Sequence, residues 1–187
     1  FDDAPSWQRT INPSGRDKDE EKSIRNYTPK IGLGAALAWH ATAGDGTDHT
    51  DGKIATEVIA LLEKHAAQPD QPFFIGCGFF RPHVPCVASQ KFFDLHPVEK
   101  FSLPNEPQEH LAKIPAVSPL VKPPNYGVPE ADLRQFTRAY YASVSQMDAQ
   151  VGRVIAALDR LQLADRTIIV FLSDHGWLLG EHGGQWQ

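Results

Sequence analysis

Two short clusters in the sequence hold side chains that could do chemistry. The first contains Arg81 and His83, and His83 stands between Pro82 and Pro85. Prolines on both sides restrict the backbone, which fixes the direction of the imidazole ring and lowers the entropy lost on binding. His83 could then hydrogen-bond an anionic oxygen or transfer a proton to a leaving group. The alternative is a surface histidine in a proline-rich turn, and Arg81 either assists an anion or is simply solvated.

The second cluster is the pair Asp174-His175, which is followed by several glycines between positions 176 and 184. A carboxylate beside an imidazole suits a divalent cation, but zinc takes about four ligands and calcium about six to eight, so other residues must contribute. The glycines would let the backbone fold tightly against a bound ion. The alternative is a turn in which Asp174 caps a helix. No dinucleotide motif and no Walker lysine occur in the chain.

Each cluster follows a stretch that predicts a β-strand. Residues 73–79 form a short apolar run that is typical of strands buried on both faces, and residues 167–172 are β-branched or aromatic. Apolar residues at steps of three and four predict helices at about 52–66, with Thr50 or Asp51 as N-cap, and at about 130–158. Ligands of open α/β sheets gather beyond the carboxyl ends of the strands, so both clusters lie where a site is expected.

The order helix, strand, long excursion, helix, strand predicts an α/β domain with a mostly parallel sheet. We expect residues 1–50 to be an irregular N-terminal segment of the same domain, with a solvated charge run at 17–22. Residues 51–187 form the central part of the domain. Within it, residues 81–129 hold ten of the fifteen prolines. So long an excursion is either a lid or binding loop, or a surface segment stiffened by proline.

Composition excludes several function classes. The chain has 187 residues, 23 acidic against 18 Lys and Arg, and a formal net charge of -5. Because binding to nucleic acid needs clustered basic residues, this balance argues against a nucleic-acid partner. The longest apolar stretches fall short of the roughly 18–20 residues that a membrane helix needs, so no membrane span is predicted.

The two cysteines and the remaining histidines predict no site of their own. Cys77 and Cys86 cannot form a disulfide scaffold or a zinc tetrad, and neither has a neighbour that would activate a thiolate. We interpret both as small, buried apolar residues. Five other histidines have no converging partner in the sequence and are assigned to the surface: His40, His49, His65, His96 and His110.

With the blocks around them, the two clusters resemble the sulfatases of the alkaline phosphatase superfamily, and within it the iduronate-2-sulfatase branch. The resemblance covers 51–187 and rests on these blocks: Pro72-Phe73-Phe74 through Arg81-Pro82-His83-Val84-Pro85; Tyr140-Tyr141-Ala142-Ser143-Val144-Ser145 with Asp148 and Val151-Gly152; and Ser173-Asp174-His175-Gly176-Trp177 with Leu179-Gly180-Glu181-His182-Gly183. Residues 1–50 match only loosely, through Asp2-Asp3 and Ser6-Trp7. The resemblance implies an alkaline phosphatase-like α/β fold, incomplete in this chain, with helices flanking a mostly parallel sheet.

The same resemblance implies roles for individual residues. Asp174 and His175 would be ligands of an active-site Ca²⁺, and His83 would be a catalytic residue that hydrogen-bonds the sulfate ester. Trp177 and the proline-rich excursion would wall the substrate pocket, with Arg81 as a further substrate-binding residue. His182 would shape the turn in which it lies. The substrate would be a sulfated sugar, with a sulfated uronic acid first, and the location lysosomal, periplasmic or secreted.

Sulfatases use a formylglycine nucleophile made in a Cys-x-Pro-x-Arg motif or its serine equivalent, and no such motif occurs here. The resemblance therefore implies that the nucleophile, the N-terminal pair of metal-binding aspartates and a sulfate-binding lysine lie outside these residues. We expect the 187-residue chain to be inactive alone. Two alternatives stay open: a metal-dependent phosphodiesterase or phosphatase of the same superfamily, and a non-catalytic relative that binds glycans.

Overall fold

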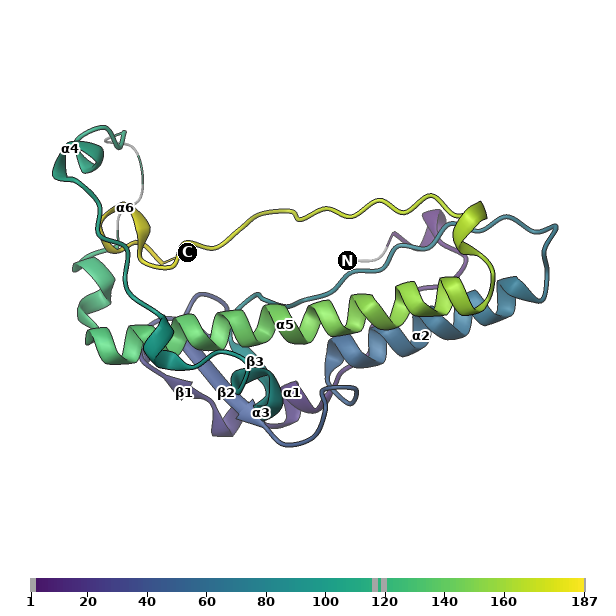
Figure 1. Cartoon of the computed structure of the whole chain (residues 1–187), viewed down its shortest axis with the longest axis horizontal. Helices are drawn as coiled ribbons and strands as arrows, with labels where there is room; N and C mark the ends of the chain where they lie inside the picture. Colours follow the sequence, from purple (N-terminus) through teal and green to yellow (C-terminus); the bar gives the residue numbers. More distant parts are fainter. Residues whose placement is uncertain (1–2, 116–117, 119–120, 187) are drawn as a thin grey trace.

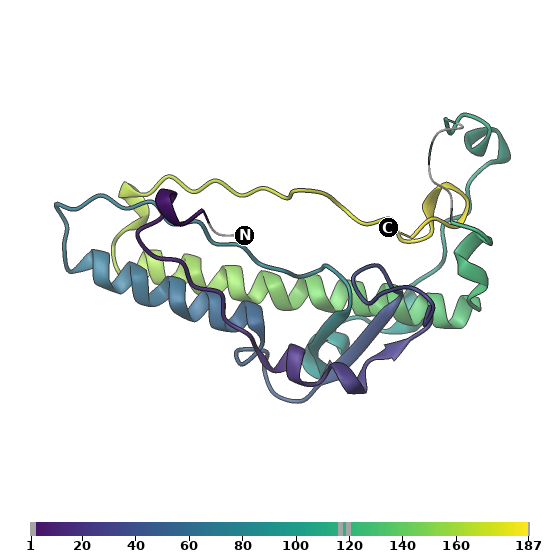
Figure 2. The same cartoon turned by 180° about the vertical axis from the view of Figure 1, so that it is seen from behind.

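Two helices that lie side by side form the long axis of the molecule (Figure 1). The computed structural model describes residues 3–115, 118 and 121–186. Helix α2 spans Thr50–Ala66 and helix α5 spans Glu130–Arg160, so both predicted helices are confirmed. They run in the same direction, and each is followed by an extended segment that returns along the helices (Figures 1 and 2).

Helix α5 begins and ends where its sequence predicts. Pro129 is its N-cap, Glu130 and Asp132 place negative charge in the first turn, and Arg160 places positive charge in the last. Both placements suit the helix dipole. Its C-terminal half packs on α2 through a small apolar cluster whose buried members are Val58, Leu62, Ala157, Leu158 and Leu163. The helix pair is therefore held by local periodicity and by burial of one apolar stripe.

The sheet is small and mixed. Strand β1 (Arg25–Asn26) pairs antiparallel with β2 (Ala38–Thr42), and β2 pairs in parallel with β3 (Cys86–Ser89). The order is β1-β2-β3, so the central strand comes from the N-terminal segment in which the sequence predicted no strand. Short elements complete the fold: η1 (Ala4–Ser6), α1 (Arg16–Asp19), η2 (Glu21–Ser23), α3 (Gln90–Phe93), η3 (Val98–Lys100), α4 (Gln108–Leu111), η4 (Pro124–Gly127), η5 (Ala164–Arg166) and α6 (Glu181–Gly184).

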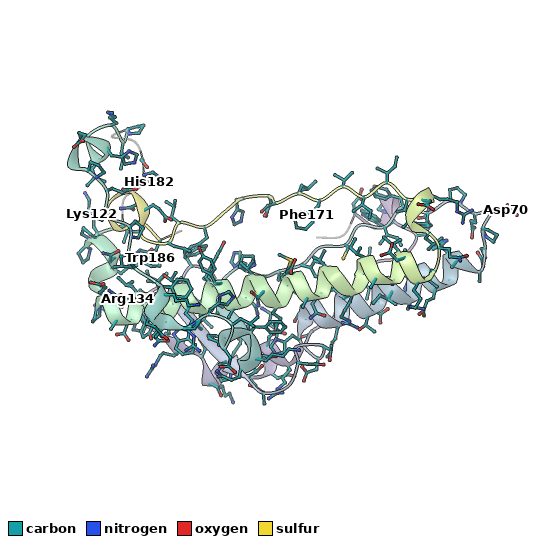
Figure 3. The ribbon with its side chains drawn as sticks, in the orientation of Figure 1. Asp70, Lys122, Arg134, Phe171, His182 and Trp186 are labelled. Carbon is teal, nitrogen blue, oxygen red and sulfur yellow. The ribbon has the colours of Figure 1, made fainter. Side chains whose placement is uncertain are left out.

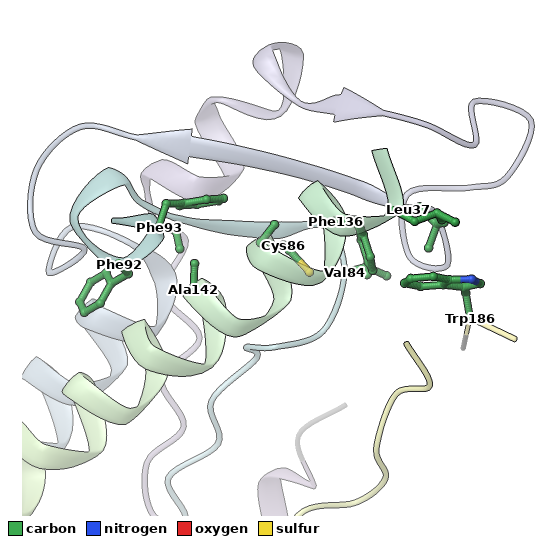
Figure 4. Packing of buried hydrophobic residues seen from close by; sticks show 11 residues of the cluster. Leu37, Val84, Cys86, Phe92, Phe93, Phe136, Ala142 and Trp186 are labelled. Carbon is green, nitrogen blue, oxygen red and sulfur yellow. The ribbon is translucent and has the colours of Figure 1, made fainter. Parts of the chain in front are cut away.

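The main core lies where α5 crosses the sheet (Figure 4). Phe136 and Trp186 are fully buried and meet edge to face, with ring centroids 5.7 Å apart. Cys86 is buried as predicted, and burial raises the pKa of its thiol to about 12. The other large or central members of the cluster are Leu37, Val84, Phe92, Phe93, Leu133, Ala139 and Ala142.

The two strands predicted at 73–79 and 167–172 are wrong as strands. Both segments are extended, but neither belongs to the sheet that the described residues form. A strand exists only as one side of a hydrogen-bonded ladder, and apolar composition alone does not supply the other side. Many of their side chains are exposed, Ile168 by 92% and Phe171 by 75% (Figure 3), whereas Phe73 and Ile75 are partly buried against the apolar cluster between α2 and α5. Cys77 lies in the first segment and is exposed, so its predicted burial is also wrong.

Other observations bear on the remaining predictions. Of the pair Asp2-Asp3, Asp2 lies outside the described residues and Asp3 is exposed. The proline-rich excursion is not one continuous loop, because β3, α3, η3, α4 and η4 all lie within it. Among the described residues, no helix combines the length and the apolar character needed to cross a bilayer.

Candidate functional site

The structure brings the two predicted clusters together. His83 lies edge-on to His175, with ring centroids 6.2 Å apart, and edge-on to Trp177 at 6.3 Å. The rings come from the two segments that follow α2 and α5, which run in the same direction (Figures 1 and 2). Parallel segments place their carboxyl ends on the same side, which is the arrangement expected of an α/β site.

Two hydrogen bonds fix His83. Its backbone N–H donates to the carbonyl of Phe80 at 2.9 Å, and its Nδ1 lies 2.8 Å from the carbonyl oxygen of Val84. A carbonyl only accepts, so the ring proton sits on Nδ1. The remaining nitrogen, Nε2, can then accept a proton, or donate one to a ligand when the ring is charged. The side chain is exposed and so accessible to a ligand.

Arg81 precedes this histidine by two residues and is only 6% exposed. Its Nη2 forms an ion pair with Asp17 at 2.7 Å, and its Nη1 donates to the carbonyls of His83 at 2.9 Å and Pro85 at 2.7 Å. The idea that Arg81 is simply solvated is therefore wrong. These contacts make it an anchor of the His83 loop, and its contact with substrate stays a prediction.

Two buried aspartates complete the anchor. Asp17 was expected in a solvated charge run, but it is 3% exposed and accepts bonds from the amide and hydroxyl of Thr50, both at 2.7 Å. Burial opposes its ionisation, yet the bonds from Thr50 and the charge of Arg81 outweigh burial and lower the pKa of Asp17. Asp51 accepts the N–H groups of Phe80 at 2.8 Å and Arg81 at 3.0 Å.

The start of α2 therefore differs from prediction. His49 is the N-cap, and neither Thr50 nor Asp51 takes that position. Asp51 lies in the first turn, and its carboxylate binds the backbone of the segment that leads to His83. Burial raises the pKa of Asp51, against the opposing effect of the two N–H donors. The first turn of α2 and the His83 loop are thus joined directly.

A second buried network joins α5 to the sheet. His49 was assigned to the surface, but it is 1% exposed. Gln146 Nε2 lies 2.9 Å from His49 Nδ1 and must donate, so His49 Nε2 carries the proton and donates to the Thr42 hydroxyl at 2.9 Å. Burial lowers the pKa of His49. Gln146 also accepts the amide N–H of Ser89 at 2.8 Å, so one glutamine ties α5 to β3 and to the start of α2.

Asp174 and His175 are both exposed, with His175 Nε2 3.7 Å from an Asp174 carboxylate oxygen. His175 Nδ1 bonds the carbonyl of Gly176 at 2.9 Å, which leaves Nε2 as its ligating atom. A carboxylate and an oriented imidazole on an accessible segment fit a divalent cation. Within the described part of the chain they offer two ligands, and the group of three potential ligands found there is a different one. Their assignment as metal ligands stays a prediction.

Trp177 connects this pair to the interior. Its indole is partly buried and packs against the main core cluster. The indole Nε1 is buried, and no hydrogen-bond partner for it occurs among the described residues. An unpaired buried donor next to His83 is a feature that an oxygen-rich ligand could satisfy. Its role as a wall of the substrate pocket stays a prediction.

Reasoning from the sequence missed the residues that hold the site rather than form it. Asp17, Asp51, His49 and Gln146 all find their partners far along the chain, so their sequence neighbours gave no sign of the contacts. It also missed the group formed by Glu106, His110 and His182. His110 lies at the surface as predicted, but its two partners were not predicted, and His182 had been assigned only to its turn.

The sequence is similar to those of several known proteins. The sequence model of the family described as Sulfatase matches residues 3–187. Iduronate 2-sulfatase of Homo sapiens is 36% identical over 97% of this chain. A sulfatase of Formosa agariphila is 39% identical over 66% of it, and choline-sulfatase of Rhizobium meliloti is 35% identical over 68%.

The chain spans 36% of the length of the human relative and 25–26% of the two bacterial relatives. Members of the matched family generally use a divalent metal ion. The match also confirms the predicted α/β, alkaline phosphatase-like fold class, of which the described residues form a part. The juxtaposed His83, His175 and Trp177, the fold and the match over nearly the whole chain agree, and the chain belongs to the sulfatase family.

Proposed function

We propose that the protein hydrolyses the sulfate ester of a sulfated sugar, with a sulfated uronic acid as the preferred substrate. The observation that supports this most directly is the approach of His83 to His175 and Trp177, at 6.2 and 6.3 Å. This approach puts the proposed proton donor, His83, beside a candidate metal ligand, His175, and beside the indole ring of Trp177. The uronic acid is suggested by the similarity to iduronate 2-sulfatase. We also propose a lysosomal, periplasmic or secreted location.

In this proposal His83 acts through Nε2. The bond from Nδ1 to the Val84 carbonyl sets the tautomer and the ring orientation. Nε2 of the charged ring would donate a hydrogen bond to an ester oxygen. As the sulfuryl group passes to the nucleophile and its bond to the sugar oxygen breaks, transfer of that proton to the sugar oxygen neutralises the charge that develops there.

Asp174 and His175 would hold a Ca²⁺ ion together with ligands from outside residues 1–187. The Asp174 carboxylate provides the oxygen that calcium prefers, and His175 is oriented by its bond to the Gly176 carbonyl. When bound, the ion supplies positive charge that stabilises the sulfuryl oxygens during transfer.

The nucleophile in this proposal is a hydroxyl of a hydrated formylglycine outside residues 1–187, which forms the new bond to sulfur. Neither cysteine of the chain lies in a Cys-x-Pro-x-Arg motif. Cys86 is moreover fully buried, with a thiol pKa raised by burial to about 12, so it does not form the thiolate that a nucleophile requires. The 187-residue chain alone should therefore show no turnover.

The test compares substrates and metals on the whole protein. An aryl sulfate, a sulfated uronic acid disaccharide and an aryl phosphate are assayed before and after removal of calcium. We expect calcium-dependent hydrolysis of both sulfates. Preference for the phosphate would favour the phosphatase alternative. Calcium and glycan binding with no hydrolysis of any ester would favour the glycan-binding alternative.

A further inference from the structure

Three potential metal ligands converge at one end of the molecule, outside the cluster around His83. His110 Nε2 lies 2.9 Å from His182 Nδ1, and a carboxylate oxygen of Glu106 lies 3.9 Å from each of these nitrogens. His110 is in α4, Glu106 precedes that helix, and His182 is in α6. We propose that Glu106, His110 and His182 bind a transition-metal ion of the Zn²⁺ type.

The spacing fits such an ion. With zinc bonds of about 2.0–2.1 Å, two ligand atoms of a tetrahedral site lie about 3.3–3.5 Å apart. The three observed separations are 2.9, 3.9 and 3.9 Å, which lie on both sides of that value. Small rotations of the side chains would therefore bring the three ligand atoms to the spacing of a zinc site. Two imidazoles and one carboxylate are a donor set that zinc accepts readily, whereas Ca²⁺ and Mg²⁺ prefer oxygen. A water molecule would complete four-coordination.

The environment of Glu106 independently calls for a cation. Its Oε2 is buried and has no hydrogen-bond partner among the described residues. A buried carboxylate oxygen without a donor is destabilising, and a cation bound to the same carboxylate would compensate it. The two imidazole rings, stacked at 5.1 Å and 17°, provide no positive charge unless one is protonated. A metal ion would supply that charge to all three groups at once.

The backbone already holds His182 in place. His182 has φ 54° and Gly183 has φ 79°, and the turn is closed by two bonds, from Gly180 N–H to the Gln185 carbonyl and from Gly184 N–H to the Gly180 carbonyl, at 2.8 and 3.1 Å. A left-handed conformation is strained for a histidine, and such strain recurs at ligand sites. Glu106 also lines a surface cavity of about 220 Å³, so an ion could reach the group from solvent.

The ion would connect two parts of the chain. Glu106 and His110 belong to the proline-rich excursion, whereas His182 follows the segment that carries Trp177. These are the two segments expected to wall the substrate pocket. The inferred role is therefore structural, since the ion would tie one wall to the other. Binding of the ion does not depend on the proposed hydrolysis, because Glu106, His110 and His182 take no part in that reaction.

The test is a titration of the metal-free whole protein with Zn²⁺ and Co²⁺ alone, in excess Ca²⁺ so that the site at Asp174 is filled. We expect one tight Zn²⁺ equivalent and the intense visible absorption of tetrahedral Co²⁺. Glu106→Gln, His110→Gln and His182→Asn should each weaken binding by about tenfold or more. Asparagine is chosen at 182 because it tolerates the left-handed conformation.

Two controls decide between this group and other ligands. His96→Gln, in which the lost histidine bonds Ser145 at 2.8 Å, should leave both titrations unchanged, and so should Asp174→Asn. Far-ultraviolet circular dichroism checks that every variant is folded. Absence of saturable Zn²⁺ binding would overturn the proposal. Unchanged Zn²⁺ affinity in the Glu106, His110 and His182 variants would also overturn it. So would a loss of Zn²⁺ affinity in Asp174→Asn as large as the loss in those three variants. Failure of sulfate hydrolysis would leave these results unaffected.

Discussion

Arg81 donates from Nη1 to the carbonyl of His83 at 2.9 Å while its Nη2 pairs with Asp17 at 2.7 Å. One guanidinium thus links the candidate catalytic loop to a carboxylate near the start of the chain. Both side chains of the pair are almost fully buried, at 4% and 3% exposure. Removal of either partner therefore leaves the other as an uncompensated charge in the interior.

Arg81→Met should lower the free energy of unfolding by about 3–5 kcal/mol, because the Asp17 carboxylate stays buried without its partner. Arg81→Lys should lower the free energy of unfolding by less, because lysine keeps the positive charge. It lacks the planar guanidinium that reaches Asp17 and two carbonyls, so some stability should still be lost. Urea unfolding measures both. Arg166→Met, in the short helix η5, is a control for loss of an arginine. A loss below about 1 kcal/mol in Arg81→Met would contradict the anchoring role.

Gln146→Leu should lower the free energy of unfolding by about 2–4 kcal/mol. The change removes the donor to His49 Nδ1 and the acceptor of the Ser89 N–H, and each buried group left without a partner costs about 1–3 kcal/mol. The matched control is Gln135→Leu on the same helix, which should change stability by less than about 0.5 kcal/mol. Equal effects of the two substitutions, again by urea unfolding, would show that the buried network contributes nothing.

His49 should make the fold sensitive to mild acid. Burial holds its pKa in the fold below the ordinary value of 6.5. In the window between the two values the unfolded chain binds a proton that the folded chain does not. The stability that the neutral His49 side chain contributes is therefore complete above pH 6.5. It is lost as the pH falls toward the pKa of His49 in the folded state. His49→Gln should flatten the decline of the unfolding free energy between about pH 7 and 5, and an equally steep decline would contradict the assignment.

His83→Gln should abolish most activity without unfolding the protein. A positioned general acid contributes about 10²- to 10⁴-fold, so kcat should fall by that factor. The exposed side chain has few packing contacts to lose, and the unfolding free energy should change by less than about 0.5 kcal/mol. A fall in activity that follows a fall in stability would mean that His83 is structural.

The two long helices could be predicted because their signal is local. Steps of three and four residues along α2 and α5 specify a buried face whatever lies opposite. The predicted strand at 167–172 failed for the converse reason, since a strand also needs a neighbour, and five of its residues from Ile168 to Leu172 are exposed. The central strand β2 was missed because its five residues show no clear alternation of buried and exposed positions.

The chemistry-bearing residues were easier to predict than those that support them. His83, Asp174 and His175 are recognisable from the short motifs in which they stand, and the structure brings His83 and His175 together. Asp17 and Arg81 are 64 residues apart, and His49 and Gln146 are 97 apart. Nothing in the neighbourhood of Asp17 or Gln146 distinguishes them from solvated polar residues, so their burial could not be predicted from pattern.

The carboxylate of Asp51 holds the amides of Phe80 and Arg81, and it stands in the first turn of α2. Formation of a helix is cooperative and its first turn is the costly step. The His83 loop therefore takes these main-chain partners from the first turn of α2. Fraying of that turn would loosen the candidate catalytic histidine, although the helix contributes no side chain to the proposed chemistry.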